Sequence, residues 1–194
     1  MLTEDDERNT TFRRNVTSEE DRITTPILFR SPQSADGPAV SALIERCPPL
    51  DTNSTYCNLL QCTHFADTCV LAQADGEIVG WISAYRPPSA PEQIFVWQVA
   101  VDARARGIGL ASRMLSELIK RPAVRNATML TTTITEANDA SWALFGAFAS
   151  RIGAPVNKCP LFEKDTHFAG LHDTEFLVSI GPFEPPATAA KELS

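Results

Sequence analysis

Residues 96–115 of the chain, VWQVAVDARARGIGLASRML, contain the feature that most limits its fold. An apolar run over residues 93–101 suits a buried strand, and residues 110–120 show the apolar spacing of an amphipathic helix. Pro122 ends the helical pattern, because proline lacks the amide hydrogen that a helix interior needs. The sequence therefore predicts a strand that passes through a short turn, residues 102–109, directly into a helix.

That turn has the composition of an anion site. Its glycines and arginines stand where the first helical turn leaves backbone N–H groups unpaired and partially positive. Glycine lets a phosphate approach the backbone, and arginine adds permanent charge. The turn lacks the Gly-Lys-Ser/Thr ending of a Walker loop and the third glycine of a dinucleotide-binding fingerprint. An ordinary strand-to-helix connection with solvated arginines remains the alternative.

Composition limits the class of protein. With 194 residues, of which 43% are hydrophobic, the chain can bury one sizeable core, so we expect one domain. A formal net charge of -7 argues against a nucleic-acid partner and favours small or cationic ones. No apolar run approaches the roughly 18 to 20 residues of a membrane span, and the N-terminus lacks a secretory signal. We expect a soluble, cytoplasmic protein with no membrane partner.

Local patterns divide the chain into three parts. Residues 1–25 are polar with few large apolar side chains and predict a disordered leader, whereas residues 183–194 are proline-rich and predict a flexible tail. Between them, residues 26–182 form the predicted domain. Its other expected elements are a strand near 27–29, helices over 36–47 and 54–64, a hairpin around Asp75-Gly76, a strand over 128–135, a helix from Asn138 or Asp139 to Gly153, and strands near 156–162 and 176–180. This order predicts an α/β (α+β) fold, a mixed central β-sheet flanked by helices.

Five cysteines, at 47, 57, 62, 69 and 159, leave one unpaired in any disulfide scheme and form no CxxC pair. We expect buried or half-buried thiols in a reducing compartment. A metal site of Cys62, His64 and His167 is the alternative, but no second cysteine pair or acidic ligand supports it, so we expect no metal.

The segment Arg104-Ala105-Arg106-Gly107-Ile108-Gly109 resembles the R/Q-x-x-G-x-G/A motif of the GCN5-related N-acetyltransferases (GNAT), and the likeness runs from about Leu28 to Ile180. The resemblance implies the GNAT fold, acetyl-coenzyme A (acetyl-CoA) as co-substrate, and a turn that holds its pyrophosphate. The cofactor-binding residues that it implies are Val99, Val101, Arg104, Arg106, Gly107, Ile108, Gly109, Asn138, Ser141 and Phe145.

Six segments resemble a narrower family, the L-2,4-diaminobutyrate acetyltransferases of ectoine biosynthesis. They are LDTNSTY, HFADTCV, GWISAYRPP, FVWQVAV, TTTITEANDASWALF and HFAGLHDTEF. This resemblance implies acetyl transfer to the γ-amine of L-2,4-diaminobutyrate, a role in osmoprotection, and a homodimer. An acetyltransferase for another small diamine or a protein amine, and a catalytically silent coenzyme A binding module, remain as alternatives.

Amine acetylation needs a site that binds ammonium, removes a proton and polarises the thioester carbonyl. Within the family-like segments we expect Glu175 to accept the proton, Asp51 to anchor an ammonium group, and Trp97 to form an apolar wall, with His172 as the second candidate base. Asn53 and Tyr56 complete the expected substrate-binding set.

Four of these residues also have a structural interpretation, which for His172 is a hydrogen-bonding group within its loop. Asp51 suits a cap for the helix near Ser54, Glu175 a surface charge, and Trp97 a core position. Phe145 stands where many acetyltransferases carry a tyrosine acid, which leaves the proton donor to the thiolate unassigned.

Overall fold

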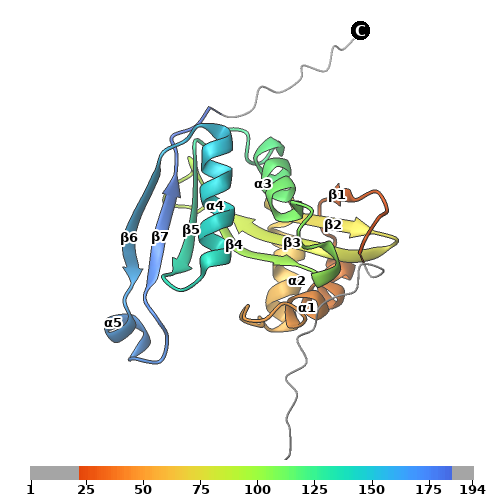
Figure 1. Ribbon diagram of the computed structural model, residues 1–194, viewed down its shortest axis with the longest axis horizontal. Helices are drawn as coiled ribbons and strands as arrows, with labels where there is room; N and C mark the ends of the chain where they lie inside the picture. The colour runs from red at the N-terminus through yellow and green to blue at the C-terminus, as the bar shows by residue number, and fades with distance from the viewer. Residues whose placement is uncertain (1–21, 185–194) are drawn as a thin grey trace, which may run out of the picture.

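The computed structural model describes residues 22–184, which form a seven-stranded mixed sheet with helices on its faces (Figure 1). The strands are β1 (Leu28–Arg30), β2 (Val70–Ala74), β3 (Glu77–Tyr85), β4 (Gln93–Val101), β5 (Met129–Thr135), β6 (Val156–Phe162) and β7 (Glu175–Ile180). The helices are α1 (Gly37–Glu45), α2 (Thr55–His64), α3 (Leu110–Lys120), α4 (Asp139–Ile152) and α5 (Lys164–Phe168), with 3-10 turns η2 (Ser34–Asp36), η3 (Ala66–Thr68) and η4 (Ala103–Ala105). The predicted fold class is confirmed, and each predicted helix and strand is present.

Local chemistry explains where the helices begin and end. The Ser54 hydroxyl accepts the Cys57 amide at the start of α2, and the Asn138 side chain accepts the Ser141 amide at the start of α4. Gly153 closes α4 in the left-handed conformation, which glycine adopts without strain. Because Ser54 is the cap of α2, the interpretation of Asp51 as that cap is wrong.

Two apolar clusters hold the layers together. One packs α3 and α4 against the sheet around Met114, Leu118 and Phe148. The other packs α1 and α2 against β2 and β3 around Leu43 and Trp81. Together they cover the sheet strands that lead into the β4–α3 turn, so the turn extends from a buried scaffold.

The strands are ordered β1-β2-β3-β4-β5-β7-β6, and every neighbouring pair is antiparallel except β4 and β5. This parallel pair is joined only over Gln93–Phe95 and Met129–Thr131. Beyond Phe95, β4 continues beside β3 alone while β5 continues beside β7. The two halves of the sheet consequently run in different directions in Figure 1, and a gap opens between β4 and β5.

The predicted ends of the domain lie largely outside the described residues. Residues 1–21 of the predicted leader and residues 185–194 of the predicted tail belong to that part of the chain. Within the described part, Ile23 packs against the core and its amide donates to the Arg104 carbonyl at 3.3 Å. Contacts with the domain therefore begin before residue 26. None of the helices between residues 22 and 184 is long and apolar enough to cross a bilayer.

Candidate active site

The gap between β4 and β5 opens into a cavity of about 560 Å³. Its walls come from the loop between α1 and α2, the divergent parts of β4 and β5, the start of α4, and the segment that leads into β7. The lining residues are Pro49, Leu50, Asp51, Asn53, Val96, Trp97, Gln98, Val99, Thr132, Thr133, Thr135, Asn138, Ser141, Phe145, His172 and Glu175. Nine of the residues singled out from the sequence meet here: Asp51, Asn53, Trp97, Val99, Asn138, Ser141, Phe145, His172 and Glu175.

A buried amide holds the α1–α2 loop at the cavity. The side chain of Gln98, on β4, donates to the Asp51 carbonyl at 2.8 Å and accepts from the Asn53 amide at 3.2 Å. Gln98 is 8% exposed, so these bonds are shielded from water. Gln98 was not predicted as a site residue. Its signal in the sequence is a polar side chain in an otherwise apolar strand, but that pattern does not say what the side chain holds.

Three ionisable groups from distant segments meet in the cavity. Glu175 opens β7 opposite Thr135 of β5. Burial, followed by the nearby Asp51 carboxylate, raises the pKa of Glu175, while a hydrogen bond from Thr133 and the proximity of His172 act in the opposite direction. Glu175 is therefore a half-buried carboxylate with a raised pKa, and its interpretation as a surface charge is wrong. A cationic ligand here would stabilise both carboxylates.

The Trp97 side chain is 47% exposed, so it is not a core residue. It lines the cavity and also a neighbouring apolar pocket of about 360 Å³, whose other lining residues are Phe65, Tyr85, Phe95, Thr133 and Phe162. Tyr56, by contrast, is 70% exposed in the first turn of α2 and is not among the residues that line the cavity. The structure thus brings Trp97 to the predicted site and leaves Tyr56 outside it.

The first turn of α4 forms another wall. Asn138 and Ser141 line the cavity there, and the positive end of a 14-residue helix dipole lies beside them. Phe145, one turn further along, is 4% exposed and has no proton to donate. No tyrosine lines the cavity, so the proton donor for a leaving thiolate stays unassigned.

The predicted anion turn follows β4 as expected. Gly107 and Gly109 have φ angles of 78° and 72°, in the region that favours glycine, and Gly109 caps α3. A Cβ at either position would meet no atom within 4 Å. Arg106 donates to the Val101 carbonyl at 3.1 Å, and Ile108 is 40% exposed. The backbone of this turn is therefore open to a ligand.

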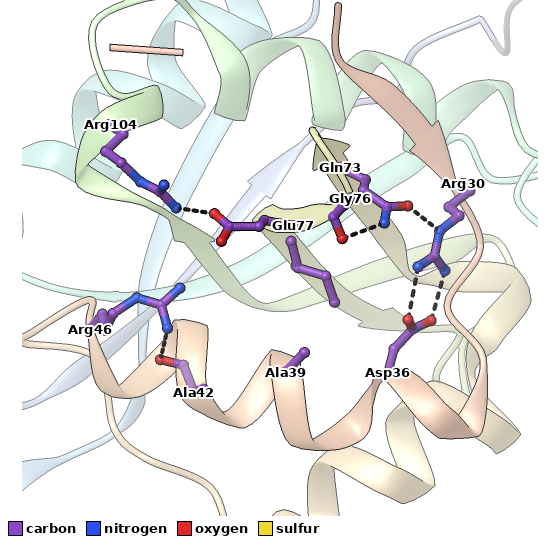
Figure 2. A pocket seen from close by; sticks show the side chains of 10 residues that line it. Arg30, Asp36, Ala39, Ala42, Arg46, Gln73, Gly76, Glu77 and Arg104 are labelled. Carbon is purple, nitrogen blue, oxygen red and sulfur yellow. Dashed lines mark hydrogen bonds and ion pairs between the residues drawn. The ribbon is translucent and has the colours of Figure 1, made fainter. Parts of the chain in front are cut away.

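Arg104 differs from its predicted role. Its guanidinium contacts Asp102 at 3.1 Å and Glu77 at 2.8 Å, and hydrogen bonds with these two carboxylates raise its pKa. The contact with Glu77 is drawn in Figure 2. Figure 2 shows this side chain on the wall of a second cleft, between α1 and the β2–β3 hairpin. Sequence reasoning placed its charge at a phosphate, whereas its side chain is engaged in ion pairs on the α1 side.

The described residues contain no group of three or more histidine, cysteine or acidic side chains that could hold a metal ion. His167, one member of the alternative metal site, accepts the Glu163 amide at 2.9 Å and packs against Phe162. All five cysteines are without disulfides, and burial raises the pKa of Cys62 to about 11. Cys159 is exposed, contrary to the expectation that every thiol is at least half-buried.

Comparison with known proteins identifies the family. The model of the acetyltransferase (GNAT) family matches residues 38–149, more than half of the chain. An L-2,4-diaminobutyric acid acetyltransferase from Methylotuvimicrobium alcaliphilum is 47% identical over 165 residues, which cover 84% of this chain and 96% of the relative. The chain belongs to the diaminobutyric acid acetyltransferases of the GNAT family. The enzyme of the same name from Halomonas elongata is 45% identical, over 82% of this chain and 83% of its own.

Solved structures agree with this GNAT assignment. Diaminobutyrate acetyltransferase EctA from Paenibacillus lautus, in complex with its substrate L-2,4-diaminobutyric acid and coenzyme A, is similar with a TM-score of 0.79 and 39% identity, covering 82% of this chain and 96% of that one. The ribosomal-protein-S18-alanine N-acetyltransferase of Escherichia coli has a TM-score of 0.61 at 15% identity, covering 87% of this chain and 99% of that one, and so shares the fold alone. The family resemblance predicted from the sequence is confirmed.

Proposed function

We propose that this acetyltransferase moves the acetyl group of acetyl-CoA to the γ-amine of L-2,4-diaminobutyrate and releases N4-acetyl-L-2,4-diaminobutyrate and coenzyme A. The observation that carries the proposal is the convergence of Asp51, His172 and Glu175 in one cavity at the β4–β5 gap. Two carboxylates in a recess suit a small molecule with two ammonium groups. The names of the curated relatives and the substrate of the P. lautus enzyme point to the same diamine.

Glu175 is the proposed general base. In the reaction, the γ-ammonium gives one proton to the Glu175 carboxylate, and its nitrogen then forms a bond with the acetyl carbonyl carbon. As the carbon–sulfur bond breaks, the nitrogen loses a second proton to give the neutral amide, the sulfur leaves as a thiolate that takes up one proton, and the proton held by Glu175 passes to solvent. A carboxylate with a raised pKa accepts a proton more readily than an ordinary carboxylate, and one such residue is enough to act as the base. His172 lines the same wall and is the alternative base.

Selectivity for the γ-nitrogen requires that the amino-acid end of the substrate is held elsewhere in the cavity. Asp51 is proposed to bind the α-ammonium group, with Asn53 beside it on the loop that Gln98 holds. Trp97 lies along the same cavity and offers an apolar wall to the methylene groups. Tyr56 lies outside the lining residues and has no role in this proposal.

Acetyl-CoA is proposed to follow the edge of β4 that β5 leaves unpaired after Phe95. Val99 lines this edge, and backbone groups here are suited to bind a thioester carbonyl and an extended amide chain. The pyrophosphate is assigned to the exposed backbone of Arg106, Gly107, Ile108 and Gly109 at the start of α3. On the opposite wall, Asn138, Ser141 and Phe145 are assigned to the coenzyme A arm.

The decisive experiment is an assay of thiol release from acetyl-CoA with a panel of amines. We expect turnover with L-2,4-diaminobutyrate, much lower turnover with an α,ω-diamine of similar length that lacks the carboxylate, and none with a lysine-containing peptide. NMR of the product should place the acetyl group on the γ-nitrogen. Preference for a peptide amine would support the protein-acetylating alternative, and coenzyme A binding without turnover on any amine would support a silent binding module.

We also infer a cytoplasmic homodimer that serves ectoine synthesis and so osmoprotection. All seven residues of the edge strand β6 are exposed, including Val156, Leu161 and Phe162, and such apolar edges are commonly covered by a partner. Thiols without disulfides agree with a reducing compartment. Sedimentation analysis should give twice the mass of one chain, and a monomer would refute the dimer.

A further inference from the structure

The cleft between α1 and the β2–β3 hairpin, about 510 Å³ in volume, contains two separate groups of charged side chains (Figure 2). In the first, Arg30 forms two hydrogen bonds with Asp36, at 2.7 and 2.8 Å, and a third with Gln73. This group joins β1, β2 and η2 and has no hydrogen bond to the β4–α3 turn. It stabilises the fold on the α1 side.

The second group converges on Asp102, the residue that follows β4. Oδ1 of Asp102 accepts the backbone amide of Arg104 at 3.0 Å and its side-chain Nε at 3.1 Å. Oδ2 accepts Nη2 of Arg104 and Nη2 of Arg46, each at 3.3 Å. The carboxylate thus connects the start of η4 to the guanidinium of Arg46, the residue that caps the C-terminal end of α1, and Asp102 is 5% exposed.

The backbone of Asp102 is anchored as well. Its amide donates to the Val79 carbonyl of β3 at 3.0 Å, and its carbonyl accepts the Ala105 amide at 2.9 Å. Burial alone raises the pKa of Asp102, but the hydrogen bonds from Arg104 and Arg46 outweigh it and the net pKa is lowered. Asp102 is therefore ionised at neutral pH and held from β3, α1 and η4 together.

The two glycines of the turn that follows have no close packing around them. No atom lies within 4 Å of the position that a Cβ would take at Gly107 or Gly109, so side-chain packing at these glycines does not define their place. The path of the turn is set by α3 after Gly109, by η4 with its Asp102 cap before Arg106, and by the hydrogen bond from Arg106 to the Val101 carbonyl. An anion site made of backbone N–H groups works only when those groups point in a common direction.

We infer that Asp102 is a positioning residue for acetyl-CoA: its carboxylate, held by Arg104 and Arg46, orients the turn whose backbone binds the pyrophosphate. The inference rests on the proposed assignment of the pyrophosphate to residues 106–109. Asp102 itself does not contact the anion, since a carboxylate would repel it; its charge is neutralised by the two arginines. Arg104, whose side chain does not lie in the cavity, thereby acquires a role in the same reaction.

The test compares Asp102→Ala with Asp36→Ala in the full-length protein. Both variants remove a carboxylate that accepts a backbone amide at a 3-10 turn and pairs with an arginine that lines the cleft. We expect calorimetry with coenzyme A to show a Kd raised about tenfold for Asp102→Ala and unchanged for Asp36→Ala, because the loss of a cap misaligns only the turn that it starts. The KM for acetyl-CoA should rise in parallel, whereas kcat at saturation and the KM for diaminobutyrate should stay within about twofold of wild type.

Conservative replacement separates positioning from general stability. Asparagine keeps an oxygen for the Arg104 amide, so Asp102→Asn should recover much of the affinity. If Asp102→Ala does not fold, Arg46→Gln tests the same link from α1, where the Arg46 side chain is 53% exposed and the variant should fold. It should raise the Kd about two- to fivefold, and Arg30→Gln, with the same change of charge, should leave it unchanged.

The outcomes discriminate between this inference and the function on which it rests. If Gly109→Val weakens coenzyme A binding but Asp102→Ala does not, the turn binds the cofactor and the positioning role is wrong. If Gly109→Val leaves the Kd unchanged, the pyrophosphate assignment itself is wrong. Equal weakening by Asp102→Ala and Asp36→Ala would show a general loss of structure and would also overturn the inference.

Discussion

Replacement of Gly109 by valine tests the cofactor turn most directly. Gly109 has φ 72° and ψ 21°, and a residue with a Cβ is strained in this left-handed region by about 1–2 kcal/mol. The added Cβ would meet no atom within 4 Å, so the Cβ itself adds no clash to the strain. For a domain of this size each kcal/mol corresponds to roughly 2–4 °C in Tm, so we expect Tm to fall by about 2–8 °C.

We expect Gly109→Val to weaken acetyl-CoA binding by more free energy than it removes from the stability of the fold. A valine side chain at Gly109 would occupy the open space over the N–H groups at the start of α3, where the pyrophosphate is assigned. Each charge-assisted hydrogen bond contributes about 1.5–3 kcal/mol, so the loss of one raises the Kd on the order of 10- to 100-fold. Calorimetric titration with coenzyme A measures this change, and thermal denaturation of the same sample measures the strain.

Gly153→Val is the matched control. Gly153 has φ 65° and ψ 26°, nearly the same backbone conformation, and a Cβ there would also meet no atom within 4 Å. It lies at the far end of the 14-residue α4, about 21 Å along the helix from Asn138 and the cavity. We expect the same loss of Tm and an unchanged Kd. An unchanged Kd for Gly109→Val, or an equal rise for both variants, would refute the reasoning.

Four further predictions concern the carboxylates of Glu175 and Asp51. Glu175→Gln should lower kcat about 10²–10⁴-fold and spare coenzyme A binding, as measured by steady-state kinetics and calorimetry, because a positioned base is lost; near-normal kcat would exclude Glu175 as the base. Because the pKa of Glu175 is raised in the folded protein, its protonated form stabilises the fold, and this contribution is lost as pH rises through the folded pKa. Glutamine resembles the protonated form, so thermal denaturation at neutral pH should give Glu175→Gln a Tm no lower than that of wild type. The same ionisation should produce an acidic limb in the pH profile of kcat/KM, rising with pH, that Glu175→Gln lacks. Asp51→Asn should chiefly raise the KM for diaminobutyrate, and an unchanged KM would remove Asp51 from the anchor role.

Local sequence signals predicted most of the elements because each has a local physical cause. The helix expected over residues 110–120 is present as α3 with the same ends, since its apolar spacing, the glycine before it and Pro122 after it act within a few residues. The hairpin around Asp75-Gly76 has the same kind of cause: both residues have positive φ, as the tight turn requires. The five-residue helix α5 was not predicted, because it is too short to show the helical repeat of apolar residues.

Site residues were harder to predict, because their partners are distant in sequence. Tyr56 lies in a segment typical of the family yet is 70% exposed outside the cavity, since the direction of a side chain on α2 depends on how that helix packs. Arg104 belongs to the glycine motif, but Glu77 and Asp102 hold its guanidinium, which lines the cleft beside α1 and not the cavity. Gln98 was missed because its role is visible only once β4 lies beside the α1–α2 loop.

By itself, the sequence determined the strand–turn–helix around the glycine motif, the order of the elements and the family, because backbone conformation and apolar periodicity are properties of neighbouring residues. Only the tertiary structure decided where the chemistry occurs. The separation of β4 from β5 after Phe95 opens the cavity, and it arises from pairing across the whole sheet. The raised pKa of Glu175 depends on burial and on Asp51, a residue more than a hundred positions away, which no local pattern encodes. Electrostatic coupling acts through space, so it exists only after the fold has brought those segments together.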